Sequence, residues 1–211
     1  MKGILYITGI LLFSLPLIVC GQSEKVTKDA RKEARKEESQ GWKSGNLKPI
    51  ANQIEDYWMK SLVVDEEEWI PIYILGEGTG TDLSQNISYE LAKASAINRC
   101  AMQMFMRVNQ LIENKKQTLI TENGEEVVED FIARSKMVID AHIPDYEIVR
   151  YQYRILKDRQ IETLLIIDIP LKEYLAFIQQ NLTNHSDPDP EATEKIIKEV
   201  FQTSDLLKQQ R

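Results

Sequence analysis

A long amphipathic helix constrains the fold of this chain more than any other feature of its sequence. It is predicted to begin near Asp82 or Ser84, either of which can cap it, and to run to about Lys116. Its apolar residues recur at spacings of three and four, so they share one side of the helix. Its middle is slender, so a sheet or a second helix can approach it closely. The small residues responsible are Ala92, Ala94, Ser95 and Ala96.

Three segments have the composition of β-strands. Residues 69–76 form a short apolar, β-branched and aromatic run. The sequence GEGTG that follows predicts a turn before the long helix. Two further segments, residues 145–157 and 161–170, carry apolar side chains at every second position, on one face of each strand. Together they predict a hairpin.

The apolar faces of the two hairpin strands predict how these strands pair. The two apolar faces lie on the same side of the sheet only if the connecting loop has an odd number of residues. We expect such a loop to pair Tyr153 with Leu165. The same register places Arg150 beside Asp168 on the outer face of the sheet. This pair would mark the register rather than stabilise the fold, because exposed ion pairs contribute only about 0–1 kcal/mol.

Residues 46–182 hold these strands, the long helix, a second helix over about 125–141 and a helix after Pro170. The simplest arrangement that lets these helices and strands bury their apolar faces together is an α+β fold. We expect a three-stranded antiparallel sheet with two long helices packed on one face. Helical extensions are predicted at both the N-terminal and the C-terminal end of this domain.

The two extensions differ in character. Residues 22–45 mix acidic and basic residues with strong helix formers and show no apolar stripe, which predicts a solvated, charged helical tether rather than a partner-binding element. Residues 183–211 begin with the linker NHSDPDP and end in an amphipathic helix over 190–209. This last helix is expected either to pack loosely on the core or to offer its apolar stripe to a partner.

Residues 1–21 have the organisation of a secretory signal. A positive charge at Lys2 precedes an apolar run, and small residues follow at its end. The first interpretation is cleavage between Gly21 and Gln22, which releases a periplasmic protein. The alternative is a lipobox in which Cys20 carries lipid and the protein sits at the outer membrane; a membrane contact is expected only in that case.

The composition argues against several classes of site. A formal net charge of −7 at pH 7 disfavours a nucleic-acid binder, which would need a basic face. Removal of the signal leaves Cys100 as the one cysteine, and we expect it to be buried. The two histidines, His142 and His185, are far apart in the sequence, so no metal site is predicted. No cofactor is expected either.

Two stretches resemble a known family. The strand ending in Gly76-Glu77-Gly78 and the helix YELAKASAINRCAMQMFMRV are similar to those of the twenty-kilodalton bacterial outer-membrane lipoproteins and of the related N-terminal domain of a flagellar ring protein. The hairpin YEIVRYQYRILKDRQIETLLIIDIP and the charged helix DARKEARKEESQGWK support the resemblance, which covers about residues 28–180. The resemblance implies a non-enzymatic role in the envelope of a Gram-negative bacterium and transfers no catalytic residue.

The sequence therefore predicts an exported, non-enzymatic interaction or scaffold protein with an envelope protein as its partner. The alternative is a small-ligand-binding protein or an unrecognised hydrolase that uses the GEGTG turn, where Gly76, Gly78, Gly80 and Asp82 would form the site. That stretch lacks the lysine-containing ending of a phosphate loop, and its acidic residues would repel phosphate. The acidic run at residues 65–68 lacks the ligand spacing of a calcium loop and is expected to be a solvated loop.

Overall fold

The computed structural model describes residues 17–64, 71–141, 143–184 and 189–202. Its helices and strands follow one another in an order close to the expected one. In chain order they are α1 (Leu17–Ser39), β1 (Lys43–Ser44), α2 (Ile50–Leu62), β2 (Tyr73–Asp82), α3 (Gln85–Asn123), α4 (Glu125–Ala141), β3 (Glu147–Ile155), β4 (Ile161–Pro170), α5 (Leu171–Asn184), α6 (Pro190–Ile197) and a π-helical turn, η1 (Lys198–Gln202).

Several predicted features lie outside the described residues. They include most of the signal segment, the acidic run at residues 65–68, His142 and His185. The side chain of Cys20 is not described either. Among the helices of the described part, none is both long enough and apolar enough to cross a membrane.

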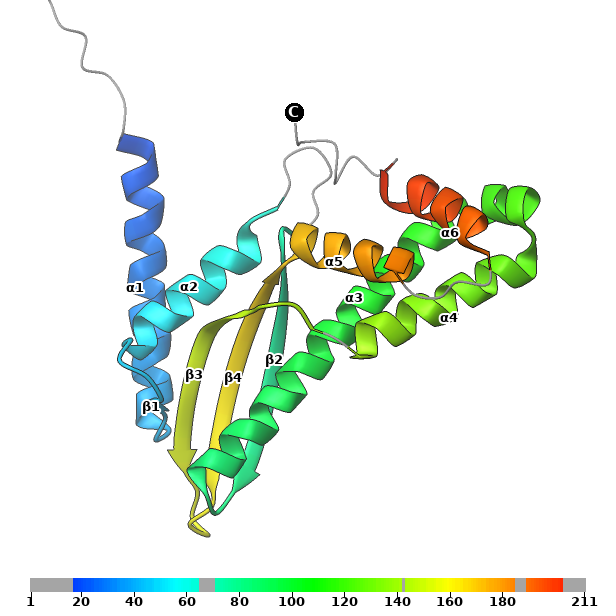
Figure 1. Cartoon of the computed structure of the whole chain (residues 1–211). Coiled ribbons are helices and arrows are strands. Elements are labelled where there is room, and N and C mark those ends of the chain that lie inside the picture. Colours follow the sequence, from blue (N-terminus) through cyan, green and yellow to red (C-terminus); the bar gives the residue numbers. More distant parts are fainter. Residues whose placement is uncertain (1–16, 65–70, 142, 185–188, 203–211) are drawn as a thin grey trace, which may run out of the picture.

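The α+β class is as expected, but the sheet has one more strand than predicted. It is antiparallel with the order β1-β3-β4-β2, and Figure 1 shows it between two groups of helices. The additional strand is β1, where Lys43 and Ser44 pair with Tyr153 and Gln152. A strand of two residues is too short to show the side-chain alternation by which strands are recognised in a sequence.

The parity of the hairpin loop was predicted correctly, although the register differs by two residues. Tyr153 lies opposite Thr163 rather than opposite the expected leucine. The Leu156 N–H donates to the Gln160 carbonyl at 2.8 Å, which leaves a three-residue loop in which Arg159 has a φ of 67°. Three-residue loops commonly end in such a left-handed residue. Because the loop starts earlier than expected, the residues of β3 nearest the loop pair with residues of β4 two positions away from the predicted ones. A shift of two residues leaves these side chains on their predicted face of the sheet.

The predicted turn at GEGTG is wrong, because β2 continues through it and pairs with β4 as far as Asp82. The glycines of this stretch instead allow α3 to lie directly on the strand. A Cβ atom on Gly78 would overlap the carbonyl oxygen of Ala92 and the main chain of Ala96. We call this contact the glycine seam. Its members are Gly76, Gly78 and Gly80 of β2 and Ser88, Ala92, Ala96 and Cys100 of α3.

The second half of α3 extends beyond the sheet and builds a helical lobe with α4, α5 and α6 (Figure 1). The prediction that two long helices cover one face is therefore wrong for α4, which packs against α3. The final helix packs on the core, which is one of the two expected alternatives, but its packing is close rather than loose. Ile196 and Phe201 are fully buried in the main core, and residues 203–209 of the predicted helix lie outside the described residues. The helices that contact this end of the chain are α3, α4 and α5.

The opposite face of the sheet is covered by α2, against which α1 packs, so helices lie on both faces (Figure 1). The interpretation of the charged N-terminal helix as a wholly solvated tether does not hold. Ala30 and Ala34, one turn apart on α1, are buried against Ile50 and Ile54 of α2. A stripe of two alanines is too narrow to be recognised as an apolar face until a partner helix lies against it.

We expect the substitution Gly78→Ala to destabilise the protein by about 2–3 kcal/mol, because the added methyl group has no room and α3 must move away from the sheet. The substitution Thr81→Ala on the same strand serves as the control. Thr81 is exposed, so only the strand preference changes, at a cost below about 1 kcal/mol. Urea unfolding curves of both variants measure the difference, and equal losses of stability would contradict the role of the seam.

Candidate functional site

One edge of the sheet has no neighbouring strand in the described part of the chain, and this edge is β2. The Leu171 N–H donates to the Ile72 carbonyl at 2.8 Å. The main-chain groups of the even-numbered residues of β2 therefore point toward β4. Main-chain groups alternate in direction along an antiparallel strand, so every second residue of β2 presents its N–H and C=O to the open side. These residues are Tyr73, Leu75, Glu77, Thr79 and Thr81.

A side chain of α3 confirms this direction. The Gln103 amide donates to the Leu75 carbonyl at 2.8 Å, so that carbonyl points away from β4 and toward the flank of α3. The helix therefore overhangs the open edge as well as the strand itself.

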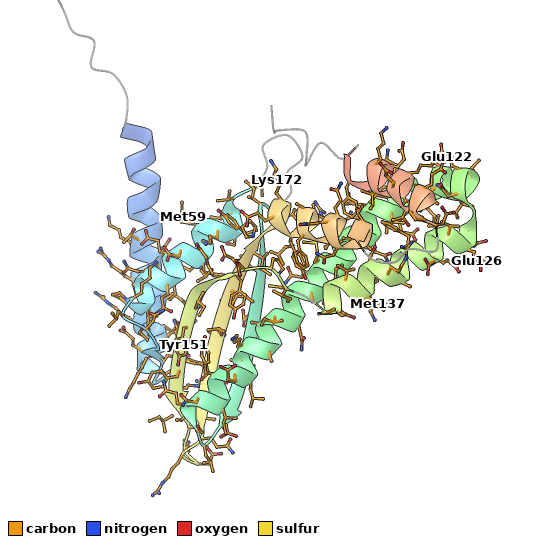
Figure 2. The ribbon with its side chains drawn as sticks, viewed as in Figure 1. Met59, Glu122, Glu126, Met137, Tyr151 and Lys172 are labelled. Carbon is orange, nitrogen blue, oxygen red and sulfur yellow. The ribbon has the colours of Figure 1, made fainter. Side chains whose placement is uncertain are left out.

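The opposite edge of the sheet is closed. The Gly45 N–H donates to the Tyr151 carbonyl at 2.9 Å, and the Tyr151 N–H donates to the buried Gln53 side chain at 2.7 Å. Figure 2 shows Tyr151 on β3, the strand that β1 and α2 cover. The two sides of the sheet thus differ: the middle of β3 pairs outward with β1, Gly45 and Gln53 of its own chain, and β2 presents most of its outward groups to the surroundings.

Two hollows lie beside the open edge, between β2 and α3, with volumes of about 460 Å³ and 410 Å³. Together with the edge they form a surface that we call the edge groove. Its residues are Glu77, Thr79, Ser95, Arg99 and Met102 around the first hollow and Tyr73, Gln103, Met106 and Arg107 around the second.

The edge groove combines unpaired cations with exposed apolar side chains. Neither Arg99 nor Arg107 forms an ion pair with a carboxylate among the described residues, and Arg107 donates only to the Gln110 side-chain carbonyl at 3.1 Å. Met102 and Met106 are 51% and 65% exposed. Such a surface can bind a chain segment through main-chain hydrogen bonds, charge and flexible apolar contact.

A second polar cluster lies where α2 covers the sheet. Lys60 bonds to the buried Asp168 and to Glu147, the latter at 2.8 Å. Burial by itself would lower the pKa of Lys60, but the hydrogen bonds to both carboxylates outweigh it and raise that pKa. Lys60 therefore stays protonated at neutral pH, and the cluster has the character of a structural ion pair rather than of a catalytic amine.

The expected pair between Arg150 and Asp168 does not form, although both residues lie on the same face of the sheet. Arg150 pairs with Glu37 of α1, and Asp168 pairs with Lys60 of α2. The prediction assumed an exposed outer face, whereas two helices cover this face and supply partners of their own. The β-bulge between Ile148 and Arg150 also separates the two residues along the hairpin.

Around Cys100, the described residues show no arrangement of nucleophile and base. Cys100 is fully buried in the glycine seam, as predicted. Burial, assisted by the negative charge of Asp168, raises the pKa of its thiol to about 12. The thiol is therefore protonated and inert at neutral pH. Within the described ranges, no group of three or more histidine, cysteine or acidic side chains is placed to hold a metal ion.

Comparison with known proteins assigns no function to these residues. The chain matches no protein-family model, and neither a curated protein nor a solved structure is significantly similar to it. The resemblance noted from the sequence motifs therefore stays a prediction, and the interpretation of the site depends on its geometry.

The residues that the sequence suggested as a ligand turn have other positions. Gly76, Gly78 and Gly80 face the helix, and the Asp82 carboxylate accepts a hydrogen bond from the Ser84 N–H at 2.8 Å, where the chain turns into α3.

The arginines of the edge groove were missed by the sequence analysis. Their signal was present as a row on α3 with a spacing of four residues, in which Arg99 directly precedes the seam residue Cys100 and Arg107 lies two turns further along. It could be recognised only if GEGTG had been taken as strand.

We expect amide hydrogen exchange to alternate along β2. The amides of Gly76, Gly78 and Gly80 pair with β4, so they should exchange about 100-fold or more slowly than those of Glu77, Thr79 and Thr81, which face the open edge. Exchange followed by NMR measures these rates residue by residue. Equal protection of both sets would mean that a further strand covers the edge.

Proposed function

We propose that this chain is a non-enzymatic, exported protein of a bacterial cell envelope and that it binds an extended segment of a partner protein along the edge groove. The observation that carries this proposal is the open edge of β2 beneath α3. An added strand would bond to the outward main-chain groups of β2, which supply affinity, while the flank of α3 would select its side chains.

The edge of β2 lacks several of the features by which natural sheets prevent strand addition. Such edges are usually short, bulged, or interrupted by proline or lysine. The ten residues of β2, Tyr73–Asp82, contain neither proline nor lysine, and their pairing with β4 runs without a register shift. A long and regular edge of this kind is suited to accept a strand.

The position of α3 disfavours a second copy of the chain as the occupant. The seam places α3 directly over β2. If two copies paired their β2 strands antiparallel, both α3 helices would lie on the same face, about 4.8 Å apart. Packed helices need about 8–10 Å between their axes. A partner segment without a helix above it meets no such obstacle.

The binding mode can be tested with a labelled peptide of the sequence Thr-Val-Thr-Gln-Thr-Val-Thr. We expect Thr79→Pro to abolish its binding, because proline removes an outward N–H that β4 does not use, and proline is tolerated on edge strands. The control Thr79→Val keeps that N–H and should bind like the unmodified protein. Fluorescence anisotropy measures binding, and circular dichroism checks that both variants fold.

Unchanged binding by the Thr79→Pro variant, or no binding by the unmodified protein, would refute the edge as a docking site. Size-exclusion chromatography with light scattering of the same samples shows whether a second copy occupies the edge instead. A dimer that Thr79→Pro dissociates would contradict the proposal.

Export can be tested separately in the native bacterium. We expect the protein in the periplasmic fraction, with an intact mass that corresponds to a chain beginning at Gln22. A mass that corresponds to a lipid-modified Cys20 at the N-terminus would instead place the protein at a membrane surface. Recovery of the uncleaved chain from the cytoplasm would contradict the envelope role.

A further inference from the structure

We propose that the segment bound in the edge groove carries two acidic side chains four residues apart, with an apolar side chain midway between them. The acidic side chains pair with Arg99 and Arg107. This inference rests on the proposed function, because it specifies the partner of the same groove.

Arg99 and Arg107 belong to one row along α3 that overhangs the open edge. The seam positions on the helix repeat every four residues, and the residues that directly precede them form a row on its flank. Gln103 and Arg107 continue this row beyond the seam at the same spacing. Ser95 and Arg99 line the first hollow, and Gln103 and Arg107 line the second. Gln103 also reaches the outward carbonyl of Leu75, so the row as a whole faces the position of an added strand.

The seam relates distance along α3 to distance along a strand. A Cβ on Gly80 would meet Ser88 and Ala92, and a Cβ on Gly78 would meet Ala92 and Ala96. Four residues of helix therefore match two residues of strand, as expected from rises of about 1.5 Å and 3.4 Å per residue.

Arg99 and Arg107 are eight residues apart, which corresponds to about 12 Å along the helix and to four residues of an added strand. An even number is required, because only every second side chain of a strand points to the same face. Two acidic side chains at this spacing can both face α3 and reach the two arginines.

The charge and polarity of the row agree with such a partner. The row from Ile87 to Arg107 includes both arginines and no acidic residue, although the chain as a whole has a net charge of −7. A guanidinium group binds a carboxylate through two parallel hydrogen bonds, which adds geometric selectivity. Met102 and Met106 are exposed beside these arginines, where a flexible thioether can cover an apolar side chain of the partner.

Three peptides of equal length test the inference with the mature chain. The matched peptide is Thr-Glu-Thr-Val-Thr-Glu-Thr, the neutral one replaces both glutamates by glutamine, and the third, Thr-Glu-Thr-Glu-Thr-Val-Thr, brings the acids two residues closer. We expect the matched peptide to bind about 5- to 10-fold more tightly than the neutral one in low salt, as two partly exposed ion pairs allow, and to lose this advantage at high salt.

The double variant Arg99→Gln, Arg107→Gln should remove the preference while the neutral peptide still binds. Lys93→Gln is the control for a lost positive charge outside the groove, because Lys93 directly follows the seam residue Ala92 and so lies on the other flank of α3. It removes one positive charge, as each of the two arginine substitutions does. This control should keep the full preference.

The outcomes separate this inference from the proposed function. Equal affinities for the three peptides, all abolished by Thr79→Pro, would overturn the acidic partner and leave edge binding intact. Equal affinities for the two acidic peptides, both above the neutral one, would overturn the four-residue spacing. If no peptide binds, or if Thr79→Pro leaves binding unchanged, the proposed function itself is wrong.

Discussion

The contact between the glycines of β2 and the main chain of α3 determines where every other layer of this protein lies. Because no Cβ separates strand from helix along the seam, α3 sits closer to the sheet than an ordinary helix packed through large side chains. This closeness aligns α3 with the edge strand and directs its far half beyond the sheet, where α4, α5 and α6 complete the core. A methyl group on Gly78 would disturb all of these layers together.

The same contact gives the two edges of the sheet different properties. At one edge, β1 and the Gln53 side chain bond to the outward groups of Tyr151 and Tyr153 in the middle of β3. At the other edge, α3 overhangs β2 but leaves its outward N–H and C=O groups open, apart from the carbonyl that Gln103 bonds. An overhanging helix hinders antiparallel pairing between two copies, yet it supplies side chains for a single added strand. In the binding mode that we propose, protection against self-association and access for a partner strand come from this one arrangement.

Two ion pairs link the second face of the sheet to its helices. Arg150 pairs with Glu37 and Asp168 pairs with Lys60; Asp168, Arg150 and Glu37 are buried or nearly so, and Lys60 is partly exposed. Buried ion pairs often add little net stability, because removing both charges from water costs about as much as the pair recovers. They do penalise wrong alignments, since a shifted helix would leave a charge buried without a partner. We infer that these pairs align α1 and α2 on the sheet.

The sequence by itself determined the elements whose patterns are local. The periodicity of α3, the strands of the hairpin and the parity of its loop follow from residues close together in the chain. Only the tertiary structure decided that GEGTG is a strand, that Ala30 is buried, how closely Phe201 packs in the core and which partner Arg150 takes. Each of these depends on a surface contributed by a distant segment. The edge groove belongs to the second group, because glycine suits both a turn and a close contact, and only the packed helix distinguishes them.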